Sequence, residues 1–437
     1  MNLCRLALSL TLIFSGYVKA IDPLGTQYKI HDYLEALSVS QYFPDWSTLG
    51  ASVCLSAMEF CLGIFLLFAI HRRVVSRLTL VLMSVMTIVS LWLWLSDPIS
   101  DCGCFGDAIH LTNVETLAKN IVLLACSAIV SWQPLRMMRF ISRSNQWIVI
   151  NYTLLFVIAS SVWCLYDLPL FDFRPYHVGA DLRKGMEIPE GEEQPKFDTT
   201  FILEKDGERR EFTLDNYPDS TWTFIDSKTV KISDGYIPPV HDFSISSVES
   251  GEDITEEVIG DPGYTFLLIS PRLEDASDKD FGEIDQIYEY CQDNGYRFIC
   301  LTSSGTKGIE RWRDITGAEY SFWQTDATTL KTIIRSNPGL LLLHDGRVIR
   351  KWSHNFLPPT SSLTGKLEEN SLGKLPSNSV PEKIFKILVW FVLPLTLLTL
   401  ADRLWAWTSW VRRKKKNNEK ENCSRQLENE HEPAAGH

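Results

Sequence analysis

The sequence has 437 residues and a formal net charge of −12 at pH 7. A chain of this length predicts about two to three domains. The acidic balance excludes nucleic acid as an expected partner, because a phosphate backbone attracts basic surfaces. Mean hydropathy is −0.03, but this average combines apolar segments near both ends with an acidic stretch between them. These features predict a membrane part, in contact with a lipid bilayer, and a soluble part.

Six apolar segments of the chain approach the roughly 20 residues that a helix needs to cross a bilayer. The first of them also has features of a secretory signal peptide, since Arg5 precedes an apolar run that ends near Ala20. We interpret this segment as a retained helix. The predicted membrane helices cover residues of about 2–19, 49–70, 78–95, 117–133, 147–166 and 384–407.

Clusters of positive residues predict the orientation of these helices, because cytoplasmic loops are enriched in Lys and Arg. An alternating path places all the clusters on one side, which must then be the cytoplasm. The sequence therefore predicts a multi-pass protein of the bacterial inner membrane with both termini in the cytoplasm. Residues 20–48, 97–116 and 167–382 would face the periplasm. The clusters are Arg72, Arg73 and Arg77; Arg136, Arg139 and Arg143; and the run 412–416.

The soluble part begins with a β-rich segment, residues 196–254, in which Asp206-Gly207 is a typical hairpin turn. Residues 255–357 alternate between buried strands and amphipathic helices in the order β-α-β-α-β-α-β-β, which predicts a mixed sheet covered by helices. We expect residues 358–383 to form a tether. Residues 408–437 would form a cytoplasmic basic stretch and a disordered tail.

The order of elements in residues 255–357 resembles the thioredoxin fold, and Asn337-Pro338-Gly339 stands where that family carries its cis-proline. Thioredoxins place C-x-x-C after the first core strand, whereas this chain has no cysteine between Ser270 and Ser277. The resemblance therefore implies a degenerate thioredoxin-like α/β domain. Such a domain could bind a partner protein beside Pro338 but could not exchange dithiols in the usual way.

The sharpest local motif is Cys102-Gly103-Cys104 in the loop after the third predicted helix. A disulfide between these cysteines would close a small, strained ring, and strained disulfides tend to be labile or catalytic. Gly103 and Gly106 allow the positive φ angles of a tight loop. Thr112 and Glu115 fit a capping box at the start of the next helix. We therefore expect a redox-active thiol pair at the outer face of the membrane.

Two alternatives for this loop stay open. The cysteines could be incidental members of a compact turn, and the neighbouring carboxylates Asp101 and Asp107 should raise thiol pKa values by repulsion. Metal binding by the cysteines with Asp107 and His110 comes last, because Cys-x-Cys lacks the usual spacing of structural zinc sites. We therefore predict no metal site.

Other ionisable and thiol residues lie in the predicted membrane helices. Glu59 is a candidate for handling a proton or a quinone headgroup, because a carboxylate in hydrocarbon is costly. A hydrogen-bonded contact with Ser or Thr on another helix is its alternative role. Cys54 and Cys164 could serve as resolving thiols, as in DsbB-type proteins that pass electrons to a quinone, although a single cysteine in an apolar helix is more often a small hydrophobe.

Several of these motifs resemble the DoxX superfamily and its MauE branch. The matching segments are Phe14–Pro23, Met58–Gly63 with Glu59, Cys102–Asp107, and Asp172–Gly179, the last of which resembles a Bacteroidota group of DoxX-family proteins. The resemblance implies a helical membrane domain over residues 1–180 that retains its first helix. MauE is implicated in the maturation of a disulfide-rich periplasmic enzyme, which supports the thiol interpretation by analogy. The large additional domain excludes carrying methylamine metabolism over.

Two functions of different classes follow. In the first, Cys102 and Cys104 exchange electrons with an envelope protein that docks on the outer domain, with a quinone as a possible cofactor. In the second, the chain is a non-catalytic scaffold or assembly factor that binds a periplasmic partner. A transporter is a weaker third function, because only one buried carboxylate is evident.

Overall fold

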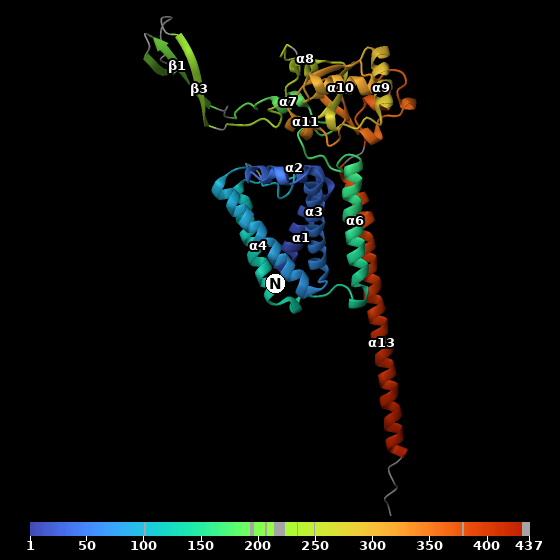
Figure 1. The fold of residues 1–437 in the computed structure, drawn as a ribbon. Helices are drawn as coiled ribbons and strands as arrows, with labels where there is room; N and C mark the ends of the chain where they lie inside the picture. Colours follow the sequence, from blue (N-terminus) through green and yellow to red (C-terminus); the bar gives the residue numbers. More distant parts are fainter. Residues whose placement is uncertain are drawn as a thin grey trace, which may run out of the picture. The chain divides into compact units, whose positions relative to one another are not determined.

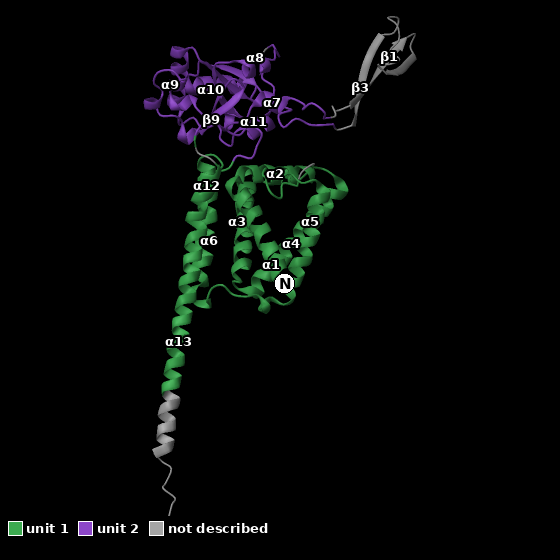
Figure 2. Cartoon of the chain, turned by 180° about the vertical axis from the view of Figure 1, so that it is seen from behind, with its two compact units in different colours: residues 1–171, 377–437 green, residues 172–376 purple. Residues whose placement is uncertain are grey.

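The computed structural model describes residues 1–99, 102–192, 196–205, 208–213, 223–233, 235–248, 250–377 and 380–430. Asp101 and the predicted turn Asp206-Gly207 lie outside these ranges. The chain forms two compact units (Figure 2): unit 1 contains Met1–Phe171 and Ser377–His437, and unit 2 contains Asp172–Pro376. The boundary therefore lies at residue 171, whereas the sequence places it near residue 180.

Unit 1 is helical (Figure 1), and six helices among the described residues are long and apolar enough to cross a membrane. The chain is thus an integral membrane protein, as the sequence predicts. The α-helices of unit 1 are α1 (Asn2–Ile21), α2 (Pro23–Ala36), α3 (Asp45–Phe68), α4 (Arg72–Ser96), α5 (Asn113–Trp132), α6 (Gln146–Tyr166), α12 (Val380–Ile387) and α13 (Leu393–Glu430). A π-helical turn at Leu388–Val392 joins α12 and α13 into one of the six spans, whereas α2 is not one of them.

Helices α1 and α3 pack at very short range because glycine lies at both contact points. A Cβ atom on Gly16 would lie 2.3 Å from the backbone nitrogen of Phe60, and one on Gly63 would lie 2.8 Å from the backbone nitrogen of Ile13. Small residues commonly allow such close backbone approach in membranes, where helix association depends on packing. This approach fixes the distance between α1 and Glu59.

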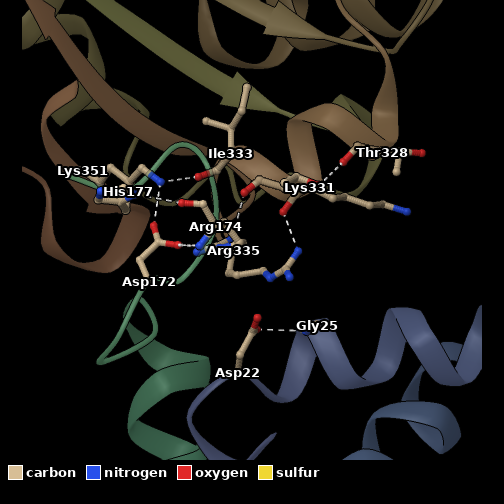
Figure 3. Close-up of polar contacts among 11 residues, drawn as sticks. Asp22, Gly25, Asp172, Arg174, His177, Thr328, Lys331, Ile333, Arg335 and Lys351 are labelled. Atoms are coloured by element: carbon tan, nitrogen blue, oxygen red, sulfur yellow. Dashed lines mark hydrogen bonds and ion pairs between the residues drawn. The ribbon is translucent and has the colours of Figure 1, made fainter. Parts of the chain in front are cut away.

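Helix α2 lies within the segment 20–48 that the sequence assigns to an outer loop. Its start is specified locally: Asp22 accepts a hydrogen bond from the Gly25 amide (Figure 3), and Pro23 occupies the first helical turn. The Ser52 hydroxyl of α3 donates to the Pro23 carbonyl. Apolar length does not reveal α2, because this helix is only 14 residues long and contains many polar residues.

The last helix packs against α6, and Figures 1 and 2 both draw the two side by side. The rings of Phe156 and Phe391 stack with their centroids 4.3 Å apart. Further along, the buried Asp402 carboxylate accepts hydrogen bonds from Ser142 and Asn145 at the start of α6. The last helix is therefore part of the helical bundle.

Helix α13 also extends to Glu430, where the sequence predicts a disordered tail from residue 417. Half of residues 417–430 are Glu, Lys, Arg or Gln, which are good helix formers, so the helix can continue. Residues 431–437 lie outside the described residues.

The positive clusters of the first two loops lie at the same end of unit 1. The Arg72 guanidinium donates to the carbonyl oxygens of Leu135 and Met137 at 2.7 and 2.6 Å. From α13, Arg403 donates to the Phe140 carbonyl at 3.0 Å. This geometry agrees with an alternating path of helices that gathers these loops on one side.

Unit 2 is an α/β domain built on a six-stranded mixed sheet of order β4-β7-β6-β5-β8-β9. The central strand β5 is buried along its whole length, parallel to β6 and antiparallel to β8. From β5 to β9 the predicted order of strands and helices is confirmed. The elements are α7 (Leu182–Met186), β4 (Ser246–Ser247), α8 (Thr255–Gly260), β5 (Tyr264–Ser270), α9 (Phe281–Asn294), β6 (Arg297–Thr302), α10 (Thr306–Thr316), β7 (Ser321–Gln324), α11 (Ala327–Ile333), β8 (Gly339–His344) and β9 (Arg347–Ser353).

A separate three-stranded antiparallel sheet, in the order β2-β1-β3, precedes the α/β core in the sequence. Its strands are β1 (Lys196–Lys205), β2 (Glu208–Thr213) and β3 (Thr223–Ser233). The pairing of Lys205 with Glu208 brackets the predicted turn.

The predicted tether instead packs into unit 2. Residues 358–376 place Leu367 in the hydrophobic core, and Tyr264 donates to the Gly373 carbonyl. The end of the predicted β-rich segment also joins this core, because Phe243 and Ile245 are buried and β4 extends the six-stranded sheet. Scattered apolar side chains therefore anchor both segments at the edges of the core.

A buried ionic cluster holds the start of unit 2 to β9 (Figure 3). The Asp172 carboxylate accepts hydrogen bonds from Arg174 at 2.7 Å and from Lys351 at 2.8 Å. Lys351 also donates to the Ile333 carbonyl at the end of α11. Burial alone would raise the pKa of Asp172, but the two cations hold it well below its ordinary value. The cluster explains why unit 2 begins at residue 172.

Candidate functional site

The Cys102-Gly103-Cys104 loop joins α4 to α5 and contains two free thiols whose sulfur atoms lie 3.1 Å apart. A small movement would bring them to the S–S bond length of about 2.05 Å. Gly103 and Gly106 have φ angles of 65° and 54°, so both glycines occupy the left-handed region, as the sequence predicts. Cys104 is buried, whereas Cys102 is half-buried.

Neighbouring elements fix this loop on several sides. The Tyr33 hydroxyl of α2 donates to the Cys102 carbonyl at 2.6 Å. The side chain of Lys29, also on α2, lies against Gly103. The predicted capping box is confirmed, since the Glu115 amide donates to the Thr112 hydroxyl and the Glu115 carboxylate accepts from the Thr112 amide. The loop is therefore held by α2 and by the start of α5.

Below the loop, Glu59 of α3 forms a buried ion pair with Lys19 of α1. The Lys19 ammonium lies 2.8 and 2.9 Å from the two carboxylate oxygens, and the residues are only 4% and 1% exposed. Glu59 therefore faces the interior of the bundle, and its partners are Lys19 and Ser15. The Ser15 contact is of the kind expected from the sequence as the alternative role of Glu59. A paired charge removes much of the cost of placing a carboxylate in an apolar bundle.

Ser15 connects this ion pair to the cysteine loop. Its hydroxyl oxygen lies 2.7 Å from Glu59 Oε2 and 2.7 Å from the Cys104 carbonyl oxygen. A serine hydroxyl carries one hydrogen. It can therefore donate to only one of these two oxygens at a time. Ser15 thus links the buried ion pair to the backbone of the cysteine loop.

The pKa values of the two thiols shift in opposite directions. The hydrogen bond from Cys102, together with the charges of Lys119 and Lys19, lowers the pKa of Cys104 to about 6, against the effect of burial. The same hydrogen bond, together with burial, raises the pKa of Cys102. The expectation that nearby aspartates raise the pKa of both thiols is therefore wrong for Cys104, because lysines and the partner thiol outweigh them.

A small cavity with room for about one water molecule lies beside Cys104. Its polar wall contains Ser15, Glu59, Lys119 and Asn120, and its apolar wall is formed mainly by Leu and Met side chains of α1, α4 and α5. Cys104 thus faces a mixed environment inside the bundle.

The other predicted thiols do not join this site. Cys54 of α3 is exposed, and Cys164 of α6 is buried with its sulfur beside the backbone of Leu170. Among the described residues, no hydrogen bond links either sulfur to the Cys102–Cys104 pair. Nor do any three His, Cys, Asp or Glu side chains in the described part gather as metal ligands would, so the metal interpretation of Asp107 and His110 gains no support.

In unit 2, the Asn337–Pro338 peptide bond is cis. Pro338 is buried, while Asn337 and Ser336 are partly exposed. Asn337 accepts a hydrogen bond from the Ser270 hydroxyl at 2.7 Å and thereby joins the end of β5 to the loop before β8. A direct contact between Pro338 and a partner stays a prediction, and its exposed neighbours would have to share it.

Both cysteines of unit 2 belong to its core. Cys291 and Cys300 are completely buried, and burial raises the pKa of each thiol. Neither can reach a partner protein without unfolding, which agrees with the sequence interpretation of these residues as core.

Sequence reasoning missed four residues of the site: Ser15, Lys19, Tyr33 and Lys119. Lys19 offered a signal, because it is a cation within one turn of an apolar helix and Glu59 is an anion in another. The remaining three lie in ordinary polar positions, and only the folded chain brings them to the cysteine loop.

Comparison with known proteins agrees with the membrane interpretation of unit 1. Residues 197–234, which contain the three-stranded sheet, match a domain of unknown function, DUF8463. No curated protein and no solved structure matches the chain. Residues 1–133 match the family described as methylamine utilisation protein MauE. The segment that is similar to MauE thus contains α1 to α5, and with them Lys19, Glu59, Cys102, Cys104 and Lys119.

Proposed function

We propose that the chain is an inner-membrane thiol–disulfide exchange protein in which Cys102 and Cys104 form the exchanging pair. The observation that carries this proposal is the pair itself: two free thiols 3.1 Å apart, in a tight loop tied through Ser15 to a buried ion pair. One thiol is acidic and the other is not, which suits a pair that alternates between dithiol and disulfide.

In this proposal the exchange takes place on the periplasmic side. Two arginine-rich loops share one end of unit 1, and cytoplasmic loops are those enriched in Lys and Arg. The cysteine loop follows α4, one helix beyond the first of these loops, so it would lie at the opposite face. Disulfides persist in oxidising compartments such as the periplasm.

Unit 2 would serve as the docking domain for a periplasmic partner protein. Its strand order and the cis peptide bond before β8 support a thioredoxin-like domain, while Ser270–Ser277 contains no cysteine. Such a domain can bind a chain beside Asn337 and leave the redox chemistry to the membrane loop.

A quinone is the class of oxidant that a bilayer could supply to restore the disulfide. Lys119 carries hydrogen-bond donors that suit a carbonyl oxygen, whereas the amide donors of Asn120 are already used on the Met86 carbonyl and the Ser90 hydroxyl. The cavity beside Cys104 has room for only about one water molecule, so the residues that line it do not enclose a quinone ring.

The test is to trap the redox state of Cys102 and Cys104 in cells by rapid alkylation, and then to compare the C102S/C104S double variant with the matched control C54S. We expect a mixture of dithiol and disulfide in the unmodified chain, and reduced envelope proteins only in the double variant. A pair that never changes state, or a double variant that behaves like C54S, would contradict the proposal.

A non-catalytic scaffold is the second candidate, favoured by the inaccessible cysteines of unit 2. It predicts that deletion of the chain has a phenotype which the C102S/C104S variant does not reproduce. The same set of strains therefore separates the two functions.

A further inference from the structure

The charged groups near the cysteine loop are distributed unevenly between its two thiols. The charged groups around Cys104 come from several elements: Lys19 from α1, Glu59 from α3 and Lys119 from α5. No titratable residue of α4 lines the cavity beside it. Of the two lysines, Lys19 is neutralised by Glu59 at 2.8 Å.

Lys119 is the second lysine near Cys104, and its charge is not neutralised in this way. Among the residues that the structure describes, no carboxylate lies within ion-pair distance of its ammonium group. The ammonium instead lies 4.1 Å from the ring centroid of Phe105, the residue directly after Cys104. Phe105 also contacts Phe14 of α1, with ring centroids 5.5 Å apart. This cation–π contact keeps one positive charge beside the loop.

Access to the two sulfur atoms is also unequal. Cys104 is 7% exposed and lines the cavity inside the bundle, whereas Cys102 is half-buried and does not line it. A protein partner can therefore approach Cys102 more readily than Cys104.

We infer that Lys119 is a positioning residue that holds Cys104 as the thiolate of the pair, so that Cys102 is the sulfur attacked by a partner and Cys104 is the leaving group. The inference rests on the proposed exchange function and assigns an order to its steps. A stabilised thiolate leaves faster, because exchange rates rise as the acidity of the leaving thiol rises.

A partner thiolate attacks Cys102, the Cys102–Cys104 bond breaks, and its electron pair stays on Cys104 beside Lys119. The second thiolate of the partner then attacks the partner sulfur of the mixed disulfide and releases Cys102 as a thiolate, which takes up a proton. The partner dithiol loses two electrons and becomes a disulfide, and the loop gains them and becomes a dithiol.

The first test measures the pH profile of Cys104 alkylation in the full chain in detergent micelles, using the C102S background so that one loop thiol reacts. Replacing Lys119 with Gln should move the profile to higher pH and slow labelling at neutral pH roughly tenfold, the effect of about one pKa unit. Lys119→Arg should restore the profile, because it keeps the charge.

Lys29→Gln is the matched control. Lys29 also touches the loop, at Gly103, but lies on the α2 side, away from the residues that line the cavity. Its replacement should leave the profile unchanged. Equal shifts from Lys119→Gln and Lys29→Gln, or none from either, would overturn the role of Lys119.

The second test needs no variant. The oxidised full chain is treated with a bulky fluorescent glutathione derivative, the freed thiol is alkylated, and fragment masses locate both groups. We expect the mixed disulfide on Cys102 and the alkyl group on Cys104. The reverse pattern, or an even distribution, would overturn the assigned order. Both tests read the chemistry of the loop in vitro, so they stay distinguishable from a failure of the exchange function in cells.

Discussion

Unit 1 and unit 2 each bury a carboxylate beside a lysine at the same distance of 2.8 Å: Glu59 with Lys19, and Asp172 with Lys351. The residue that completes each of these two clusters differs. Asp172 is completed by Arg174, a second cation, so the cluster in unit 2 is fully ionic and faces backbone carbonyls. Glu59 is completed by the Ser15 hydroxyl, which also reaches the carbonyl of Cys104. The first arrangement fastens two segments of unit 2 together, whereas the second is joined through Ser15 to a loop that carries two thiols.

The cysteines of the two units differ in the same way. Cys291 and Cys300 are sealed in an apolar core, and burial raises their pKa values. Cys104 is also buried, yet a thiol donor and nearby lysines lower its pKa to about 6. Burial alone therefore does not make a cysteine inert. The surrounding charges and donors decide its acidity.

The largest expected effect comes from leaving a charge unpaired in unit 1. Replacing Glu59 with Leu strands the Lys19 ammonium among apolar side chains and should cost about 3–5 kcal/mol of stability. Thermal unfolding of the full chain in detergent would measure it. The double variant K19M/E59L should recover most of the loss, and a double variant as unstable as E59L would show that the pair is not the cause.

In unit 2, replacing Asp172 with Asn leaves Arg174 and Lys351 without their counterion and should cost about 3 kcal/mol. Asp345→Asn is the matched control, because its ion pair with Arg183 is largely exposed and such pairs contribute little. Hydrogen exchange of the β9 amides in the full chain would report the difference. Similar exchange in both variants would contradict a structural role for the cluster.

The same carboxylate gives a pH dependence. Because the pKa of Asp172 in the folded chain lies well below its ordinary value, its contribution is complete above the ordinary carboxyl range. The contribution begins to fall as the pH drops through that range and is fully lost only below the depressed pKa of the folded chain. The protection of β9 in the unmodified chain should therefore decline on acidification. Asp172→Asn should lack this component.

A smaller effect should follow from widening the contact between α1 and α3. A Cβ atom at Gly16 would meet the Phe60 backbone, so Gly16→Ala should cost about 2 kcal/mol by overpacking. Gly50 of α3 has open space around it, so Gly50→Ala is the control and should not destabilise the chain. Equal melting temperatures for the two variants would show that the close approach is unimportant.

The smallest effect concerns the cap beside the cysteine loop. Thr112→Ala removes the side-chain acceptor at the start of α5 and should cost about 1 kcal/mol. Faster amide exchange in the first turn of α5 and faster labelling of Cys102 would accompany it. Val114→Ala changes an exposed side chain in the same turn and should have neither effect.

Particular features of both units could be predicted from the sequence because they arise from local patterns. The six membrane helices follow from apolar length, and the order of strands and helices from β5 to β9 follows from alternating periodicities. The cap at Thr112 and the left-handed glycines of the cysteine loop are local signals of the same kind. The cysteines themselves were found because Cys-x-Cys is a pattern of neighbours.

Only the tertiary structure decided what surrounds those cysteines. Ser15, Glu59 and Lys119 come from three different helices, and their meeting at Cys104 depends on close packing that Gly16 and Gly63 allow. The polar helix α2, the packed segment 358–376 and the docking of α13 on α6 likewise depend on partners far away in the chain. Periodicity and composition indicate whether a segment faces water, lipid or a protein core. The acidity of a thiol and the formation of an ion pair depend instead on atoms a few ångströms apart, which the sequence separates by tens of residues.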